Sequence, residues 1–280
     1  MIFRVHPSLV IVALGLVGHK VGRAAEESTA RAVQDNSFLI EEAYNQEIGV
    51  LQHILNVPVS FAGHQKNIAP NVTEEWPVFS ELHQFSYTVP YTFAQDDGWD
   101  SGFGDIRLNY RFQLWKEGDR TPAFAPRFTL VIPTDGGGEK FGHQEVGYET
   151  NLPFSKVVGD RWTLHANLGG NIFPDDYGRN PINYNLGESV VYAVSKNLNL
   201  MLESVEVWGE SVSHRGKIDR TFTALISPGA RYAFNLPKGA QIVVGAAVPV
   251  GISADAPDWG LFFYFSFEHK FTHSESVAPK

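Results

Sequence analysis

Apolar and polar side chains alternate along much of the chain, and the clearest run lies between Gly104 and Trp115. Its even-numbered positions are all apolar from Ile106 to Leu114, and its odd-numbered positions are all polar from Asp105 to Gln113. Because successive side chains of a β-strand point to opposite faces, this run predicts a strand with one apolar and one polar face. The pattern recurs to the end of the chain. It therefore predicts a transmembrane β-barrel with lipid outside and a wet, polar lumen inside.

The alternating runs and the turn signals between them divide the chain into strands. We expect an all-β fold, a single antiparallel transmembrane β-barrel of about 12 strands with up-and-down topology. The expected strands are Ile48–Phe61, Glu74–Phe79, His83–Phe93, Phe103–Lys116, Pro122–Thr134, Gln144–Lys156, Arg161–Phe173, Tyr184–Ser195, Leu198–Gly209, Asp219–Asn235, Ala240–Ser253 and Trp259–Phe271. Short turns alternate with longer loops, of which Ala62–Thr73 is the first. An even strand number with this alternation places both termini in the periplasm, below a bacterial outer membrane.

The N-terminus has the organisation of a secretory signal peptide, residues 1–24. Arg4 lies in a short positive leader, residues 8–18 form an apolar core, and residues 22–24 are a small-residue cleavage site. Residues 25–47 would then form a periplasmic N-terminal segment, 48–271 the barrel and 272–280 a C-terminal tail. Asn36 or Ser37 could cap a short helix in that segment. The segment either folds into the lumen as a plug, packs beneath the barrel as a lid, or is a tether without a role.

Composition narrows the function classes. The chain has 280 residues, no cysteine and a formal net charge of −9. The absence of cysteine excludes disulfide bonds and thiolate metal sites, and the acidic balance argues against nucleic acid as a partner. We expect no cofactor, no metal ion and no catalytic residue. The expected partners are outer-membrane lipid and lipopolysaccharide, a small-molecule solute, and the outer-membrane assembly machinery, because the aromatic closing strand resembles the signal which that machinery reads.

Five stretches of the chain carry a family resemblance. They are Asn36–Glu47, His83–Gln84, Thr88–Tyr91, Gly102–Ile106 and Pro126–Thr134. In this order they resemble the MetA-pathway-of-phenol-degradation family of outer-membrane proteins, and the likeness covers most of the mature chain. The resemblance implies a β-barrel that moves small, often aromatic or hydrophobic compounds across the outer membrane. The family label fixes no substrate.

Charged and polar side chains on the inward parity are the candidate functional residues. Hairpin register predicts Arg111 opposite Arg127, Arg127 beside Asn151, and Asn151 opposite His165. With residues from other levels, the expected lumen-lining set is Arg107, Arg111, Arg127, Glu145, Glu149, Asn151, His165, Arg231 and Glu268. The belt is either a constriction that orients a polar solute or an ion-pair network that fills a narrow lumen. Neither sign of charge dominates, so no charge selectivity is predicted.

Two functions from different classes are consistent with this pattern. The first is a channel or transporter for small, aromatic or hydrophobic molecules, which needs a barrel wall and no catalytic group. The second is an outer-membrane enzyme that modifies lipid or lipopolysaccharide. Such an enzyme needs a serine and a histidine in hydrogen-bond contact on the lipid-facing side. His269 has outward parity without an obvious serine beside it, so the sequence favours the channel.

Overall fold

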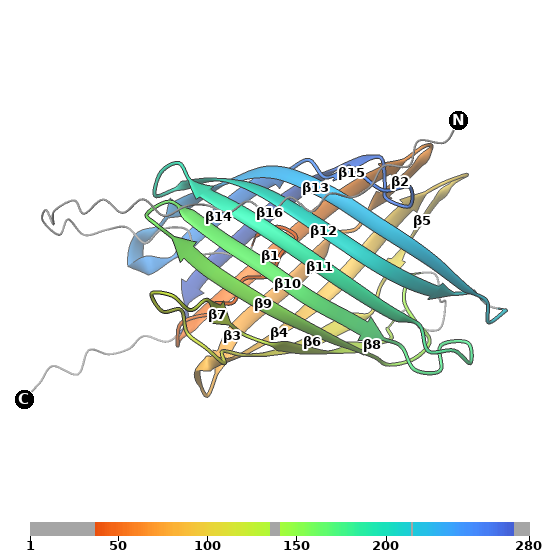
Figure 1. Ribbon diagram of the computed structural model, residues 1–280, viewed down its shortest axis with the longest axis horizontal. Coiled ribbons are helices and arrows are strands. Elements are labelled where there is room, and N and C mark those ends of the chain that lie inside the picture. Colours follow the sequence, from red (N-terminus) through yellow and green to blue (C-terminus); the bar gives the residue numbers. More distant parts are fainter. Residues whose placement is uncertain (1–36, 135–140, 214, 272–280) are drawn as a thin grey trace, which may run out of the picture.

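The computed structural model describes residues 37–134, 141–213 and 215–271. They form one antiparallel sheet that closes on itself, because the first strand pairs with the last from Val50 opposite Lys270 to Phe61 opposite Trp259 (Figure 1). The strand segments are β1 (Val50–Ala62), β2 (Gln65–Ile68), β3 (Asn71–Val78), β4 (Ser80–Gln95), β5 (Trp99–Phe103), β6 (Ile106–Phe112), β7 (Ala123–Phe124), β8 (Arg127–Ile132), β9 (Gly147–Val158), β10 (Trp162–Ile172), β11 (Ile182–Ala193), β12 (Leu198–Val212), β13 (Ile218–Asn235), β14 (Gln241–Ala247), β15 (Val250–Gly251) and β16 (Trp259–Lys270).

The sixteen segments make twelve barrel strands, as predicted, because four strands are interrupted. The pairs β2–β3, β7–β8 and β14–β15 each continue in one register across a break that contains Pro70, Pro126 or Pro249. Proline has no N–H to donate to the ladder, so the strand pairing lapses there. The fourth break, between β5 and β6, shifts the register by one residue. Among the described residues, no helix is long and apolar enough to cross a membrane.

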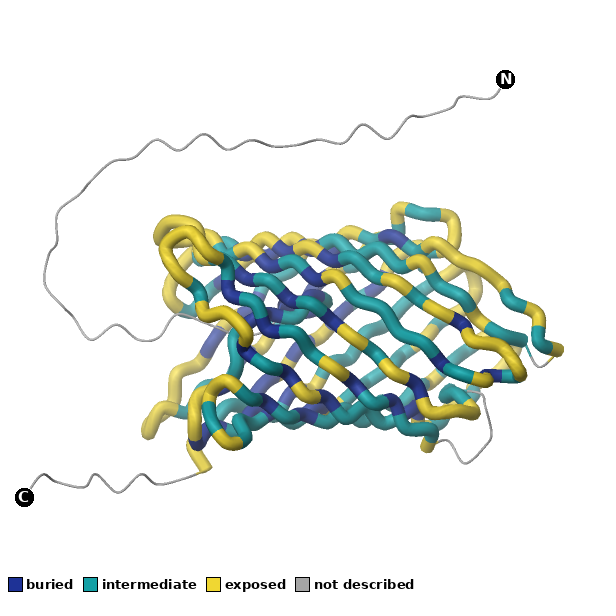
Figure 2. The backbone as a smooth tube through the Cα atoms, turned by 60° about the horizontal axis from the view of Figure 1, so that its bottom comes forward, coloured by how far each residue is buried: buried dark blue, intermediate teal, exposed yellow. Residues whose placement is uncertain are grey.

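Burial alternates along the strands, and this confirms the predicted inward and outward faces (Figure 2). On β8, the inward-facing residues Thr129 and Val131 are 0% and 1% exposed. The outward-facing residue Phe128, which precedes Thr129, is 48% exposed. Large apolar side chains with similar exposure occur on the outward face of every long strand from β9 to β16. Apolar surface of this extent is what a lipid-facing wall requires.

The two ends of the barrel differ less in loop length than the sequence predicts. We call the end where β1 begins and β16 ends the near end, and the opposite end the far end. The first far-end loop, expected over Ala62–Thr73, is a two-residue turn in which Ala62 pairs with Gln65. Gly63 has φ +57°, the left-handed conformation that such tight hairpins need. At the near end, in turn, β6 ends at Phe112 and β7 begins at Ala123, and a bridge between Trp115 and Phe124 is the pairing within the connection, which is longer than expected.

One predicted hairpin register is wrong. Asn151 pairs with Gly169, and His165 pairs with Ser155, so Asn151 and His165 are not opposite each other. β9 continues to Val158 and β10 begins at Trp162, which centres the turn two residues later than expected. Moving a turn centre by two residues moves each cross-strand partner by four and keeps its parity. Both side chains therefore still face the lumen, at different heights.

The barrel interior is divided into an apolar and a polar side. Buried apolar residues from β1, β11, β12, β13, β14 and β16 form one cluster with Phe38: Ile54, Val191, Met201, Ala233, Val243, Ala247, Phe262 and Tyr264. Buried polar residues line β4, β6 and β8 to β10 without such a cluster, and others, such as Glu203 and Arg231, lie among the strands of the apolar side. The predicted signal peptide (1–24), residues 25–36 of the predicted N-terminal segment, and the tail (272–280) lie outside the described residues.

Candidate functional site

Residues Ser37–Glu47, which we call the lumen segment, lie inside the barrel. The segment forms no helix, and its backbone is hydrogen-bonded by side chains of the wall instead of a neighbouring strand. The N–H groups of Leu39, Glu41 and Ala43 donate to Glu203 Oε1 (2.8 Å), Asn167 Oδ1 (2.8 Å) and Ser155 Oγ (2.7 Å), respectively. These wall side chains come from β12, β10 and β9, which lie in the same part of the sheet, so these three N–H groups face the same side of the barrel.

A tight reversal connects the lumen segment to the wall. Val50, the first residue of β1, donates its N–H to the carbonyl of Glu47 at 3.1 Å. Gly49 adopts φ +78° within this turn, a conformation that glycine reaches without steric cost. The chain therefore leaves the lumen at the near end and returns up the wall as β1.

Aromatic packing anchors the inner part of the segment. The ring of Phe38 lies 5.4 Å from the ring centroids of both Phe262 and Tyr264. Two glycines of the wall make room for the segment. A Cβ at Gly245 would lie 2.3 Å from Phe38 Cζ, and a Cβ at Gly187 would lie 2.3 Å from Ile40 Cδ1. Because glycine has no side chain, each of these positions leaves a space, which we call a socket, for Phe38 or Ile40.

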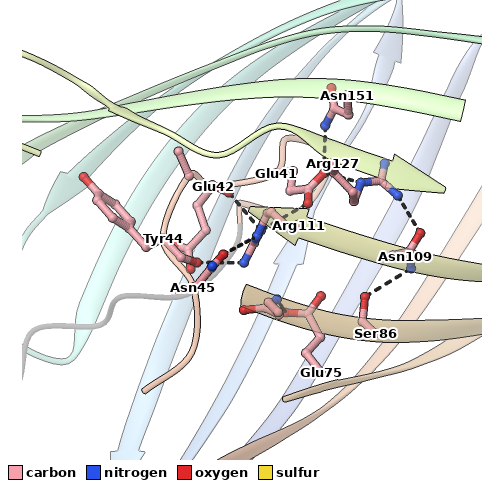
Figure 3. A network of polar contacts seen from close by, with 12 residues as sticks. Glu41, Glu42, Tyr44, Asn45, Glu75, Ser86, Asn109, Arg111, Arg127 and Asn151 are labelled. Atoms are coloured by element: carbon pink, nitrogen blue, oxygen red, sulfur yellow. Dashed lines mark hydrogen bonds and ion pairs between the residues drawn. The ribbon is translucent and has the colours of Figure 1, made fainter. Parts of the chain in front are cut away.

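Glu41 is the centre of the polar network (Figure 3). Its Oε1 accepts from Arg111 Nη1 at 3.1 Å, and its Oε2 accepts from Arg127 Nε at 2.9 Å and from Asn151 Nδ2 at 2.7 Å. Burial would raise the pKa of the Glu41 carboxyl, but Arg127 first and Arg111 second, with Asn151, hold that pKa below its ordinary value. Glu41 is therefore a carboxylate in the lumen, paired with two guanidinium groups.

Arg111 binds the lumen segment through its whole guanidinium group. Nε donates to Asn45 Oδ1 (2.9 Å), Nη1 to the Glu42 carbonyl (3.0 Å), and Nη2 to the Tyr44 carbonyl (2.7 Å). With the bond to Glu41, these contacts use four donors of a side chain that is only 3% exposed. Buried cations require this degree of pairing, because an unpaired charge away from water is strongly unfavourable.

Arg127 connects the segment to the wall. Beyond Glu41, it donates to Asn109 Oδ1, Thr129 Oγ1 and Glu149 Oε1, each at 2.7 Å. Glu149 also lies 3.7 Å from the half-exposed Arg107. The expected neighbours Arg111, Arg127, Glu149 and Asn151 are thus brought together, around an acid of the lumen segment.

The other predicted residues occupy separate places. His165 is buried and its Nδ1 lies 2.7 Å from Ser155 Oγ. Arg231 is buried on β13, opposite Asn199 of β12. Glu268 faces inward near the near end, opposite Gln52 and Gln241. Glu145 does not line the lumen, because β9 begins only at Gly147 and leaves Glu145 exposed in the preceding loop.

The lumen segment separates two cavities. The cavity toward the far end has a volume of about 190 Å³ and is lined by apolar Phe38, Ile54 and Tyr264 and by polar side chains that include Asn109 and Arg127. The cavity at the near end has a volume of about 230 Å³, and its lining includes Tyr44, Lys116 and Glu117. Solute entering from either end would meet the lumen segment.

Sequence reasoning missed most of the residues that hold the segment. Asn167, Ser155 and Gly187 carry no motif, and their role depends on which wall residues the segment faces. The one available signal was Glu41, in an acidic pair with Glu42 that interrupts the apolar residues of the segment, which implies a basic partner inside the barrel.

Comparisons with known proteins give the fold a context. No family model matches the chain, and no curated protein matches its sequence. The chain is similar in structure to an outer membrane channel from Pseudomonas putida F1, with a TM-score of 0.63 and 14% identity over 85% of this chain and 99% of that one. The KdgM porin in complex with disordered oligogalacturonate matches with a TM-score of 0.44 and 10% identity, over 78% of this chain and 99% of that one. The NanC porin matches with a TM-score of 0.45 and 9% identity, over 77% of this chain and 99% of that one. The first likeness shows a shared fold, and the two porins are too distant to add to it.

Proposed function

We propose that this protein is an outer-membrane channel for small molecules and that the lumen segment occupies the solute path. The observation that carries the proposal is a polar-lined barrel interior with one cavity on each side of the segment. A closed wall with an apolar exterior separates such an interior from lipid. The fold shared with a solved outer membrane channel supports this function.

The proposal includes a location and an orientation. The apolar exterior faces outer-membrane lipid and lipopolysaccharide, after removal of a signal peptide over residues 1–24 and insertion by the assembly machinery. β1 begins and β16 ends at the near end, where Phe271 donates its N–H to the Gly49 carbonyl at 2.9 Å. With the near end in the periplasm, both termini of the mature chain are periplasmic.

The proposed solute is a small molecule with an apolar, often aromatic part and a hydrogen-bonding part. The resemblance to the MetA-pathway-of-phenol-degradation family suggests this class. The far cavity supports it, because its wall combines Phe38 and Tyr264 with the amide groups of Asn56 and Asn109.

The enzyme alternative has one observation in its favour, the 2.7 Å contact between Ser155 and His165. Both residues are buried in the lumen, and Ser155 Oγ accepts the N–H of Ala43 from the lumen segment. A nucleophile must be reachable by its substrate, whereas here the segment covers the serine. The pair is therefore better explained as part of the segment's binding site than as a lipid hydrolase.

Planar-bilayer recording of the refolded protein tests the proposed function. The mature chain should give small or infrequent conductance steps, and the chain without residues 25–46 should give larger and more stable ones. Heat-modifiable migration on a gel provides the control that both forms are closed barrels. If neither form conducts and neither admits a small aromatic acid into liposomes, the proposed function is wrong.

A further inference from the structure

Two histidines and a glutamate form a cluster on the outer surface of the barrel, away from the lumen. His53 lies between the inward-facing Gln52 and Ile54, so it points outward. Glu74 is directly opposite His53 on β3, and His269 lies diagonally across on β16. The cluster thus spans three neighbouring strands close to the near end, a level at which polar side chains on the outer face reach the membrane interface.

A hydrogen bond fixes the tautomer of His53. His53 Nδ1 lies 3.1 Å from Glu74 Oε1. A carboxylate only accepts hydrogen bonds, so this Nδ1 carries the proton. In a neutral imidazole the other nitrogen, Nε2, then bears a lone pair.

The Nε2 lone pair of His53 faces the ring of His269. The Nε2 atoms of His53 and His269 are 3.2 Å apart, and the two rings are within 17° of parallel. At this distance the lone pair either accepts a hydrogen bond from His269 Nε2–H, or both Nε2 atoms bind one metal ion.

The separation of the nitrogens suits a metal ion. With Zn–N bonds of 2.0–2.1 Å and tetrahedral angles, two imidazole nitrogens on one zinc ion are about 3.3 Å apart. Metal-binding histidines commonly donate their other ring nitrogen to a carboxylate that orients the ring. Glu74 lies in that position relative to His53, because it contacts His53 Nδ1 and leaves Nε2 available. Tyr87 lies directly opposite Glu74 on β4.

We propose that His53 and His269 bind a divalent transition-metal ion such as Zn²⁺ on the outer surface of the barrel, with Glu74 orienting His53. Imidazole nitrogen is a ligand that zinc, copper and nickel prefer. The two histidines supply two positions of a tetrahedral site and water fills the others. Among the described residues, no group of three or more His, Cys, Asp or Glu is arranged to hold a metal ion, so the proposed site has two protein ligands and no third.

Calorimetric titration of the refolded full-length protein with ZnCl₂, in detergent, tests the proposal. The wild-type protein should bind one Zn²⁺ that His53→Gln and His269→Gln each abolish, while Glu74→Gln weakens binding about tenfold. His83→Gln is the matched control, because His83 is an outward histidine that bonds Tyr110 at 2.6 Å and should leave the titration unchanged.

A second measurement does not depend on the variants. The X-ray absorption spectrum of the zinc-loaded wild-type protein should show two imidazole ligands, and Zn²⁺ should raise the thermal unfolding midpoint of the wild type alone. Equal Zn²⁺ binding by the wild type and the His53→Gln/His269→Gln double variant would overturn the proposal. So would a wild-type protein that binds no Zn²⁺, since the histidine pair would then share only a proton.

Discussion

The side-chain amide of Asn167 pairs with both backbone groups of Glu41. Its Oδ1 accepts the N–H at 2.8 Å, and its Nδ2 donates to the carbonyl at 2.7 Å. In a sheet, a neighbouring strand would supply this pair of bonds. Because one side chain replaces the strand, the lumen segment is held without belonging to the sheet. It can leave the lumen without breaking any pairing of the wall.

Asn167→Ala should loosen the lumen segment and leave the barrel intact. The substitution leaves two backbone groups of Glu41 without these partners, at a cost of about 1–3 kcal/mol to the docked segment. Amide hydrogen exchange of residues 38–45 should accelerate, whereas exchange in β9 to β12 should not. Asn171→Ala is the control, because Asn171 lies on the same strand and bonds Asn183 instead of the segment. Equal exchange in both variants would disprove the role of Asn167.

Gly187→Ala should displace the segment through a single contact. The added Cβ would lie 2.3 Å from Ile40 Cδ1 but 3.7 Å from the nearest wall atom, Ser204 O. The wall therefore tolerates the methyl group, and the flexible end of the Ile40 side chain must move away from it. Single-channel conductance should rise in Gly187→Ala and return toward the wild-type level in Gly187→Ala/Ile40→Ala. A variant whose conductance does not respond to Ile40→Ala would show that the socket is unimportant.

Arg111→Ala combined with Arg127→Ala should open the lumen. The double substitution leaves the Glu41 carboxylate buried without a cation, which costs about 3–5 kcal/mol for a buried pair. Conductance or uptake of a small aromatic acid should increase while the barrel still migrates heat-modifiably. Arg107→Ala should have a smaller effect, since Arg107 is half-exposed and 3.7 Å from Glu149. A correctly assembled double variant with unchanged conductance would mean that these arginines do not control the lumen.

Acid should release the lumen segment through Glu41. The pKa of this carboxyl is lower in the docked segment than its ordinary value of 4.5, which it regains in water. A lowered pKa stabilises the docked state at pH values above 4.5, and that stabilisation is lost as the pH falls through the docked pKa. Conductance of the wild type should therefore rise below about pH 4.5. Glu41→Gln should lack this component, and an identical acid response in both proteins would exclude Glu41 as its source.

The sequence predicted the strands of the barrel wall better than the contacts of the lumen segment inside it. A period of two identifies the face of each strand wherever one side is apolar, so the outward position of Phe128 and the inward position of Thr129 followed directly. Turn centres carry no such signal, which is why Asn151 and His165 were paired wrongly. Contacts between the lumen segment and the wall join residues far apart in the sequence, such as Leu39 and Glu203 at a separation of 164 positions, and no local pattern encodes them.

A reversible covalent lock tests the central claim, that the lumen segment lies in the solute path. Ser37 Oγ and Ser189 Oγ are 2.7 Å apart, and the chain has no cysteine of its own, so Ser37→Cys/Ser189→Cys introduces one defined disulfide. Single-channel conductance should be recorded at acidic pH, first oxidised and then after addition of a reductant. The account predicts a closed channel when the bond is formed and openings once it is reduced. Equal conductance in both states, with the disulfide verified by mass spectrometry, would contradict it.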